Sequence, residues 1–327
     1  MVTRELDSAP GFVGLYARTL APLVPGASRL PWVGGGGREI PDLALSLMGA
    51  RAEPGRVAEY ARVCGFLIGE ELPATYPHVL AFPLHLALMA DPSFPFAAVG
   101  LVHVANEIAQ LRPLGLGERL DLRVHATPLQ EHPRGRVFSL VSEARIGDEL
   151  VWRELSTMLR RGGGGGGAGG GGGGGGGKAP AEELATPSAP FAAEWQLPGD
   201  LGRRYAAVSG DRNPIHLHPL SARALGFPRA IAHGMWTKAR CLAALQQDEA
   251  ARGTLAGAFS VQVRFRRPIL LPARVGFASA ADGEGAFRFG VRDAASDTDH
   301  LDGRLQPLAG GQLPPLEAGI RAERTAR

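Results

Sequence analysis

The chain has 327 residues, more than one hydrophobic core usually organises, so two domains are expected. Its hydrophobic content of 45% is typical of a globular protein. The net charge of +3 comes from arginines interleaved with acidic residues, which argues against nucleic-acid binding. Cys64 and Cys241 lie in different halves, so no disulfide framework is expected. Short apolar runs and a mixed-charge start predict neither a membrane span nor a signal peptide, and favour a cytoplasmic enzyme.

The first half of the chain changes character near residue 38. Residues 1–37 contain several prolines and the run Gly34–Gly37, and predict an irregular N-terminal segment. Residues 38–161 are strand-rich, with apolar residues alternating from Leu120 to Val124. We therefore expect a β-rich domain over this range.

A nearly pure glycine tract, Gly162–Gly177, follows that domain. It lacks the Lys-Ser/Thr pair and the strand-turn-helix context of a phosphate-binding loop. Because glycine loses the most backbone entropy on ordering, residues 162–186 are predicted to form a flexible linker. A second domain is expected over 187–310, followed by a C-terminal tail over 311–327.

The second domain repeats the first. YARVCGF at 60–66 aligns without gaps with YAAVSGD at 205–211, and RPLGLGERL at 112–120 aligns with RPILLPARV at 267–275. The offset is 145 residues for the first pair and 155 for the second, so the second copy holds ten extra residues between them. Where the second copy has Asp211, the first has a phenylalanine. The chain therefore holds two copies of one fold, with the chemistry expected in the second.

The stretch YAAVSGDRNPIH places an acid, an amide and an imidazole within six residues, at Asp211, Asn213 and His216. Pro214 has a restricted φ and biases Asn213 away from the α region, so we expect the three side chains on a rigid extended turn rather than on a helix. Such a set can activate a water molecule. Taken singly, the acid and the amide are also ordinary turn residues, and the histidine an ordinary buried one.

A helix and several strands are predicted after this motif. The helix spans 234–247, with Met235, Ala239 and Leu242 at helical spacing. One long helix followed by antiparallel strands allows a sheet to wrap around the helix. The strands are predicted at 259–265, 275–277, 287–291 and 300–305.

Two separated motifs resemble the signature of the MaoC-like, (R)-specific enoyl-CoA hydratases, also called hydratase 2. The matching residues are Tyr205, Ser209, Gly210, Asp211, Asn213, Pro214, Ile215, His216 and Ala222 in the first motif, and His233, Gly234 and Met235 in the second. The resemblance implies an α+β double hot-dog fold, in which each half is an antiparallel sheet wrapped around a long central helix. It also implies that the degenerate first half widens the tunnel for the acyl chain and pairs with the active half sheet to sheet.

The resemblance implies reversible hydration of trans-2-enoyl thioesters to (R)-3-hydroxyacyl thioesters. This reaction needs a base for the water, a proton donor for the α-carbon and stabilisation of the enolate. Asp211 and His216 are expected to activate one water, with Asn213 beside them. The amide of Gly234, at a helix start, is expected to face the thioester oxygen. No metal is implied, because the histidines lack an HExxH motif or cysteine partners. The resemblance also implies no cofactor, since coenzyme A or an acyl-carrier arm is part of the substrate.

Further side chains are expected around the substrate. Arg264 and Arg267 suit the phosphates of the acyl carrier, although a solvated outer face explains them equally well. His233 is expected to act mainly by orienting the turn. The substrate-binding set is Tyr205, Ser209, His233, Met235, Arg264 and Arg267.

Two other functions stay open at this level. A hot-dog thioesterase would cleave the C–S bond, but the Asp-x-Asn-Pro-x-His order argues against it. A non-catalytic acyl-thioester binding or scaffolding subunit would not need an acid and a base placed for one water. The sequence leaves open the acyl chain length, the choice between coenzyme A and a carrier protein, the physiological direction, the pathway and homodimer formation.

Overall fold

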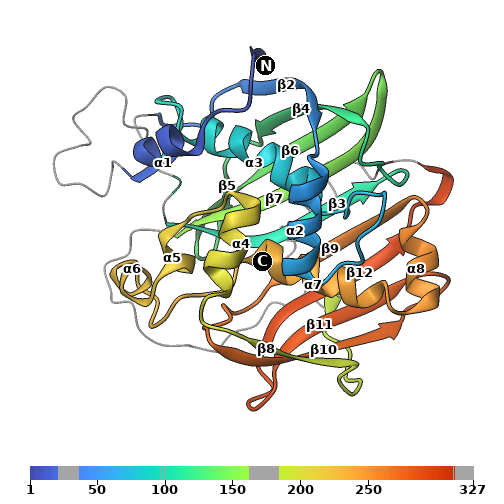
Figure 1. Ribbon diagram of the computed structural model, residues 1–327. Helices are drawn as coiled ribbons and strands as arrows, with labels where there is room; N and C mark the ends of the chain where they lie inside the picture. The colour runs from blue at the N-terminus through green and yellow to red at the C-terminus, as the bar shows by residue number, and fades with distance from the viewer. Residues whose placement is uncertain (21–36, 97, 99, 162–183, 312, 314–327) are drawn as a thin grey trace.

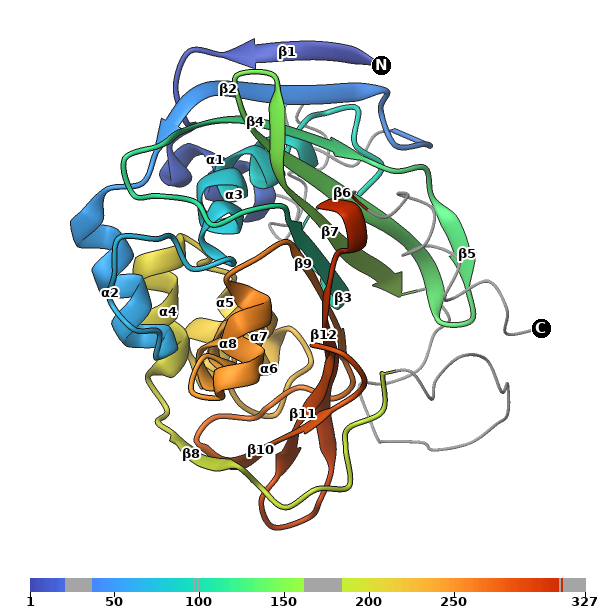
Figure 2. The same ribbon diagram turned by 90° about the vertical axis from the view of Figure 1, so that its right-hand side faces the viewer.

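A single twelve-stranded sheet runs through both halves of the protein, as a computed structural model shows. Its helices gather on one side of the curved sheet (Figures 1 and 2). The structure describes residues 1–20, 37–96, 98, 100–161, 184–311 and 313. Within this part of the chain, no helix combines the length and the apolar character that crossing a membrane requires.

Each half supplies strands and helices in a comparable order. The N-terminal half contains β1 (Val2–Leu6), α1 (Phe12–Leu20), β2 (Leu43–Arg51), α2 (Pro54–Cys64), α3 (Tyr76–Met89), β3 (Leu101–Gln110), β4 (Arg119–Ala126), β5 (Gln130–His132), β6 (Gly135–Ile146) and β7 (Glu149–Arg161). The C-terminal half contains β8 (Ala193–Leu197), α4 (Leu201–Ser209), α5 (Pro214–Leu217), α6 (Pro219–Ala224), α7 (Gly234–Leu245), α8 (Glu249–Leu255), β9 (Phe259–Phe265), β10 (Ala273–Ala281), β11 (Phe287–Asp293), β12 (Asp299–Pro307) and a 3-10 turn at Ala309–Gly311.

The sheet order is β1-β2-β4-β6-β7-β3-β9-β12-β11-β10-β8, with β5 paired to β6 at one side. The two halves meet where β3 runs antiparallel to β9. At this seam Glu107 lies opposite Gln262, whose side-chain Nε2 donates to Glu107 Oε2 at 3.0 Å. These two residues are 155 apart, the offset of the Arg-Pro pairs. Equivalent positions of the two copies thus face each other, as a local two-fold relation requires.

The central helix of each half packs on the face of its own sheet. Helix α3 contacts β2, β4 and β6, and α7 contacts β11. Both are buried along most of their length, so their hydrophobic residues form the core together with the facing strands. The predicted α+β double hot-dog fold is confirmed, with one addition: β1 is parallel to β2, whereas the other paired strands are antiparallel.

The repeated Tyr-Ala motifs form the last turns of α2 and α4. Tyr60 and Tyr205 are both buried, with ring centroids 6.0 Å apart. Each helix ends at a glycine in the left-handed region, Gly65 at φ 84° and Gly210 at φ 77°. Glycine has no Cβ to disfavour this conformation, which explains its presence at the same place in both copies.

The prediction that residues 1–37 are irregular is wrong for their described part. Strand β1 pairs with β2 at the edge of the sheet through its backbone. Because its side chains are largely exposed, the sequence of β1 shows little hydrophobic alternation. Helix α1 packs on α3 and buries Leu15. Most of the predicted linker and of the C-terminal tail lies outside the described residues.

Candidate active site

The Asp211 loop begins where α4 ends. After Gly210 the chain runs through Asp211 to Asn213, which has φ −57° and ψ 126° and caps α5. The Asn213 side chain accepts a hydrogen bond from the amide of Ile215 at 3.4 Å. Pro214 is the first residue of the helix, where its missing N–H costs nothing.

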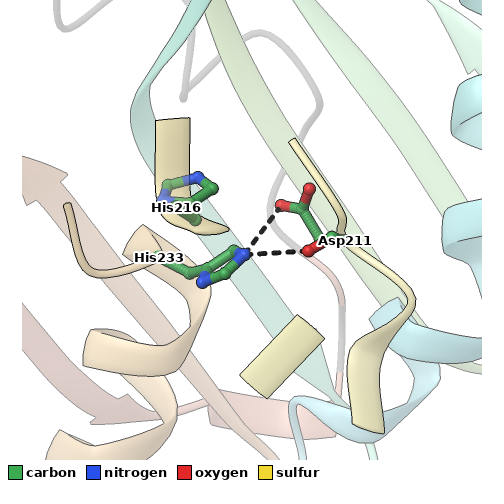
Figure 3. Close-up of side chains that lie close together, drawn as sticks. All are labelled: Asp211, His216 and His233. Atoms are coloured by element: carbon green, nitrogen blue, oxygen red, sulfur yellow. Dashed lines mark hydrogen bonds and ion pairs between the residues drawn. The ribbon is translucent and has the colours of Figure 1, made fainter. Parts of the chain in front are cut away.

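The prediction of a wholly extended turn is therefore wrong for His216. The residue before the proline is extended, as expected, but the proline itself starts the short helix α5, which carries His216. The helical turn brings the His216 ring back over the loop, next to the side chains of Asp211 and His233 (Figure 3).

His216 is buried and held in one tautomer. Its Nδ1 lies 2.8 Å from the backbone oxygen of Ile231, which can only accept, so Nδ1 donates. In the neutral ring Nε2 then carries the lone pair. Burial lowers the pKa of His216, while Asp211 and the Ile231 carbonyl oppose this shift. The ring is thus suited to accept a proton at Nε2.

His233, the N-cap residue of α7, stacks on His216 with ring centroids 3.7 Å apart. Its Nε2 donates to the backbone oxygen of Asp211 at 3.0 Å and lies 3.7 Å from the Asp211 carboxylate (Figure 3). Burial, with His216 adding to it, lowers the pKa of His233 to about 3, so the ring is neutral. Its geometry orients the loop.

The Asp211 side chain is 28% exposed and lies on the cavity wall. Burial raises the pKa of its carboxyl, but the interactions with His233, His216 and the Asn213 amide outweigh this effect and lower it. Asp211 is therefore ionised at neutral pH. A carboxylate and a neutral imidazole whose Nε2 carries the lone pair together match the demands of water activation.

Helix α7 starts at Gly234, and this end of the helix faces the same cavity. The first amides of a helix have no intrahelical partner, and the helix dipole favours negative charge there. A Cβ at Gly234 would lie 3.0 Å from the Phe265 ring. Glycine thus allows the aromatic ring and the helix start to approach closely.

A cavity of about 390 Å³ connects the two halves. From the C-terminal half its walls include seven of the ten predicted site residues: Asp211, Asn213, His216, His233, Gly234, Met235 and Arg267. From the N-terminal half they include Tyr16, His78, Phe82, His85, Met89 and His103.

Three residues that were expected to bind substrate do not line the cavity among the described residues: Tyr205, Ser209 and Arg264. Tyr205 lies behind His233, with ring centroids 4.8 Å apart. Ser209 donates to the Tyr205 carbonyl and accepts from the Asp211 amide. These two therefore support the loop rather than contact a ligand. Arg264 lies on β9, opposite Ala105 of β3.

The cavity also contains groups that sequence reasoning missed. Tyr16, on α1, donates to the Gly210 carbonyl at 3.0 Å and accepts from the Arg212 amide at 2.6 Å. His78 precedes His233 by 155 residues, the offset of the Arg-Pro pairs, so extending the repeat alignment would have found it. No comparable signal marks Tyr16.

The donor atoms of Asp211, His216 and His233 lie within 4.8 Å of one another, a spacing that a metal ion can bridge. All three groups are also engaged in, or adjacent to, the hydrogen bonds that fix the loop. The three side chains could therefore hold a metal ion only by sharing atoms with these hydrogen bonds or by using the atoms that face the cavity.

Comparisons with known proteins agree with this geometry. The MaoC like domain family matches residues 185–301. The chain is 34% identical to 3-hydroxyacyl-thioester dehydratase X of Mycobacterium tuberculosis over 270 residues, which is 83% of this chain and 91% of that protein.

Solved structures show the same relationship. The crystal structure of HtdX of Mycobacterium tuberculosis superimposes with a TM-score of 0.68 and 34% identity, over 81% of this chain and 100% of that one. A MaoC-like dehydratase from Phytophthora capsici, at 19% identity, shares the fold with a TM-score of 0.65 over 83% of this chain and 97% of that one. The chain therefore belongs to the MaoC-like dehydratase family and is a hydro-lyase.

Proposed function

We propose that the protein catalyses the reversible hydration of trans-2-enoyl thioesters to (R)-3-hydroxyacyl thioesters. The observation that carries this proposal is the pairing of an ionised Asp211 with a neutral His216 on one cavity wall, beside the start of α7. The relatives named 3-hydroxyacyl-thioester dehydratases support the choice of substrate class.

In the proposed mechanism, one water binds between the Asp211 carboxylate and His216 Nε2. His216 accepts a proton as the water oxygen forms a bond to C3, and the C2–C3 π electrons move toward the thioester carbonyl. The amide at Gly234 donates to the developing enolate oxygen. The proton held by His216 is then delivered to C2, which leaves the imidazole neutral again. Because one water serves both carbons, the addition is syn, and dehydration is the reverse path.

We propose that no metal ion takes part, because the helix start can polarise the thioester and the Asp211–His216 pair can activate the water. Full activity after extensive treatment with a chelator would support this, and activity that is lost and then restored by one divalent ion would contradict it.

The acyl carrier is proposed to meet arginines at the cavity edge. Arg134, Arg161 and Arg267 are exposed and contribute to the cavity lining, and guanidinium groups bind phosphate oxygens well. Coenzyme A and a phosphopantetheine arm both offer such phosphate. Arg267→Ala should therefore raise KM with little change in kcat.

The test is the loss of enoyl-thioester absorbance with a short and a long trans-2-enoyl-CoA. Asp211→Asn and His216→Ala should slow the reaction roughly a hundredfold or more, as expected for deleting a general acid or base. His218→Asn is the matched control, because His218 is exposed and an asparagine retains its role as the cap of α6. Consumption of the product by an (R)-specific but not an (S)-specific 3-hydroxyacyl-CoA dehydrogenase would establish the stereochemistry.

An acyl-thioester binding or scaffolding subunit would give a different result: it would bind both thioesters without changing their absorbance. A thioesterase would release free thiol.

We also propose a cytoplasmic location. It is supported by Cys64 and Cys241, which are buried and unpaired, as in a reducing compartment. Since the two hot-dog halves already pair within one chain, the fold does not need a homodimer, and sedimentation would decide whether one forms.

A further inference from the structure

The cavity has a polar wall that the hydration reaction does not use. Helix α3 faces it with His78, Phe82, His85, Leu86 and Met89, at the i, i+4, i+7, i+8 and i+11 spacing of one helix face. A stripe that served only to hold an alkyl chain would be apolar throughout. Two imidazoles in this stripe, with ring centroids 5.4 Å apart, therefore call for a ligand with a polar group.

His78 is fixed by a carboxylate. Its Nδ1 lies 2.8 Å from Oε2 of Glu154, a β7 residue that is fully buried. Glu154 also accepts a hydrogen bond from Asn106 Nδ2 at 2.7 Å. Burial raises the pKa of Glu154, but His78 and these hydrogen bonds outweigh it and lower the pKa to about 2. The ionised carboxylate can only accept, so His78 Nδ1 donates.

This arrangement leaves Nε2 of His78 for a ligand. The residue is 7% exposed and lines the cavity, and the described residues make no other hydrogen bond to its ring. The second imidazole, His85, is engaged at Nε2 by Ser142 Oγ at 2.6 Å. Burying an ionised glutamate is costly, and a buried charge that orients a cavity-facing histidine is typical of a functional site.

The position of His78 relates it to the reacting carbons. His78 and Asp211 line the same cavity from opposite halves of the chain. His78 lies at the start of α3 and Met89 at its end, so the stripe extends over ~16 Å at about 1.5 Å per residue. Gly234 lines the same cavity as this stripe, so the cavity allows an acyl chain whose thioester lies at Gly234 to extend along it.

We propose that His78, held by Glu154, binds a hydroxyl group on the acyl chain, so that the preferred substrates are hydroxylated enoyl thioesters. A neutral His78 accepts from that hydroxyl at Nε2, and a protonated one donates to its oxygen, so a hydroxyl satisfies the ring in either state. A ketone would satisfy only the protonated ring, and a methylene neither. This inference rests on the proposed function for the placement of the thioester.

The test separates binding from turnover. Saturated acyl-CoAs cannot react, so their dissociation constants report the cavity alone. Calorimetry would compare an unsubstituted saturated acyl-CoA with analogues of equal chain length that carry one hydroxyl at successive carbons beyond C4. We expect one position to bind roughly tenfold more tightly than the unsubstituted ligand, the value of one net hydrogen bond.

Three variants test the role of the polar pair. His78→Phe combined with Glu154→Leu removes both members of the pair, so neither is left without the other, and should abolish the preference. Glu154→Gln retains the shape but not the charge, and should weaken it. Phe82→Leu is the matched control: it changes the same stripe without a polar atom, and should keep the preference.

Equal affinity of the parent protein for all members of the series would overturn the inference, whether or not the double variant folds. Retention of the preference in a folded double variant would also overturn it. Hydration of the unsubstituted enoyl-CoA is scored separately, so equal affinities with normal turnover reject hydroxyl recognition and leave the proposed function intact. Selective binding without turnover would reject the proposed function alone.

Discussion

The hydroxyl of Tyr16 donates to the carbonyl of Gly210, although the two residues are 194 positions apart in the chain. The same oxygen accepts from the amide of Arg212, so α1 holds the loop on both sides of Asp211. Phe12 of the same helix occupies the space beside Gly210. The N-terminal segment thus takes part in positioning the Asp211 carboxylate of the other half, which we propose to be catalytic.

Tyr16→Phe should lower kcat/KM roughly tenfold, because a loop that shifts by a fraction of an ångström misplaces the water. Tyr76→Phe is the control. Tyr76 is buried, whereas Tyr16 is partly buried, and the Tyr76 hydroxyl makes no hydrogen bond with the described residues. Steady-state kinetics and thermal unfolding of both variants would check this. Equal kinetics for Tyr16→Phe and the parent would contradict a positioning role.

Activity should resist acidification. Burial lowers the pKa of His216 below its ordinary 6.5, and Asp211 has a lowered pKa as well, so the ionised acid and the neutral base coexist throughout the neutral range. Hydration kcat/KM should thus be flat near pH 7 and fall only below pH 6.5. An acid limb above that value would contradict the assignment.

The same profile has an internal control. Asp211 raises the pKa of His216, so in Asp211→Asn the residual activity should show an acid limb at still lower pH than the parent. A limb that moves upward would mean that another group titrates.

Gly234→Ala should impair the chemical step. The new Cβ would meet the Phe265 ring at 3.0 Å, so either the ring or the helix start must shift, and the amide would move from the thioester oxygen. Loss of one such donor costs roughly a hundredfold in kcat at most sites, and a displaced donor should cost at least tenfold. The matched control is Gly253→Ala in α8, where a Cβ meets nothing within 4 Å. That change should leave kcat unaltered and stabilise the helix slightly.

Lys238 should make stability depend on alkaline pH. It is fully buried on α7, where Nζ donates to Asn106 Oδ1 and to the Val261 carbonyl. Burial lowers its pKa to about 7, against the attraction of Glu154 and Glu107. Between pH 7 and the ordinary value of 10.5 the unfolded chain therefore binds more protons than the folded one, and stability rises with pH.

Lys238→Met removes this dependence. The free energy of unfolding of the parent, relative to the variant, should rise across that window by at most about 1.4 kcal/mol per pH unit. Urea unfolding at several pH values between 7 and 10 would measure it. The variant also leaves Asn106 with one partner fewer, but this offset does not vary with pH. A pH-independent difference would show that the lysine titrates at its ordinary pKa.

Much of the fold follows from local sequence signals. The alternation over 259–265 marks β9 at both ends, and the helix predicted from residue 234 begins there. Helix α3 was harder to recognise. It is buried on nearly all sides and contains Pro77 and Pro83, so it shows neither a one-sided apolar stripe nor the usual absence of proline.

The proposed catalytic set could be recognised for the same reason: Asp211, Asn213 and His216 are close in the sequence, and turn chemistry is local. The repeat offset further indicated that the chemistry belongs to the second copy. By itself, then, the sequence determined the two-copy architecture and indicated the half and the residues for which we propose the chemistry.

Only the tertiary structure decided what surrounds that loop. Tyr16 reaches Gly210, and His78 meets Glu154, because helix packing and the register of β7 beside β3 bring distant residues together. Such contacts leave no periodic pattern in the chain, since each partner obeys only the propensity of its own element. The cavity wall is therefore a property of the assembled sheet and helices.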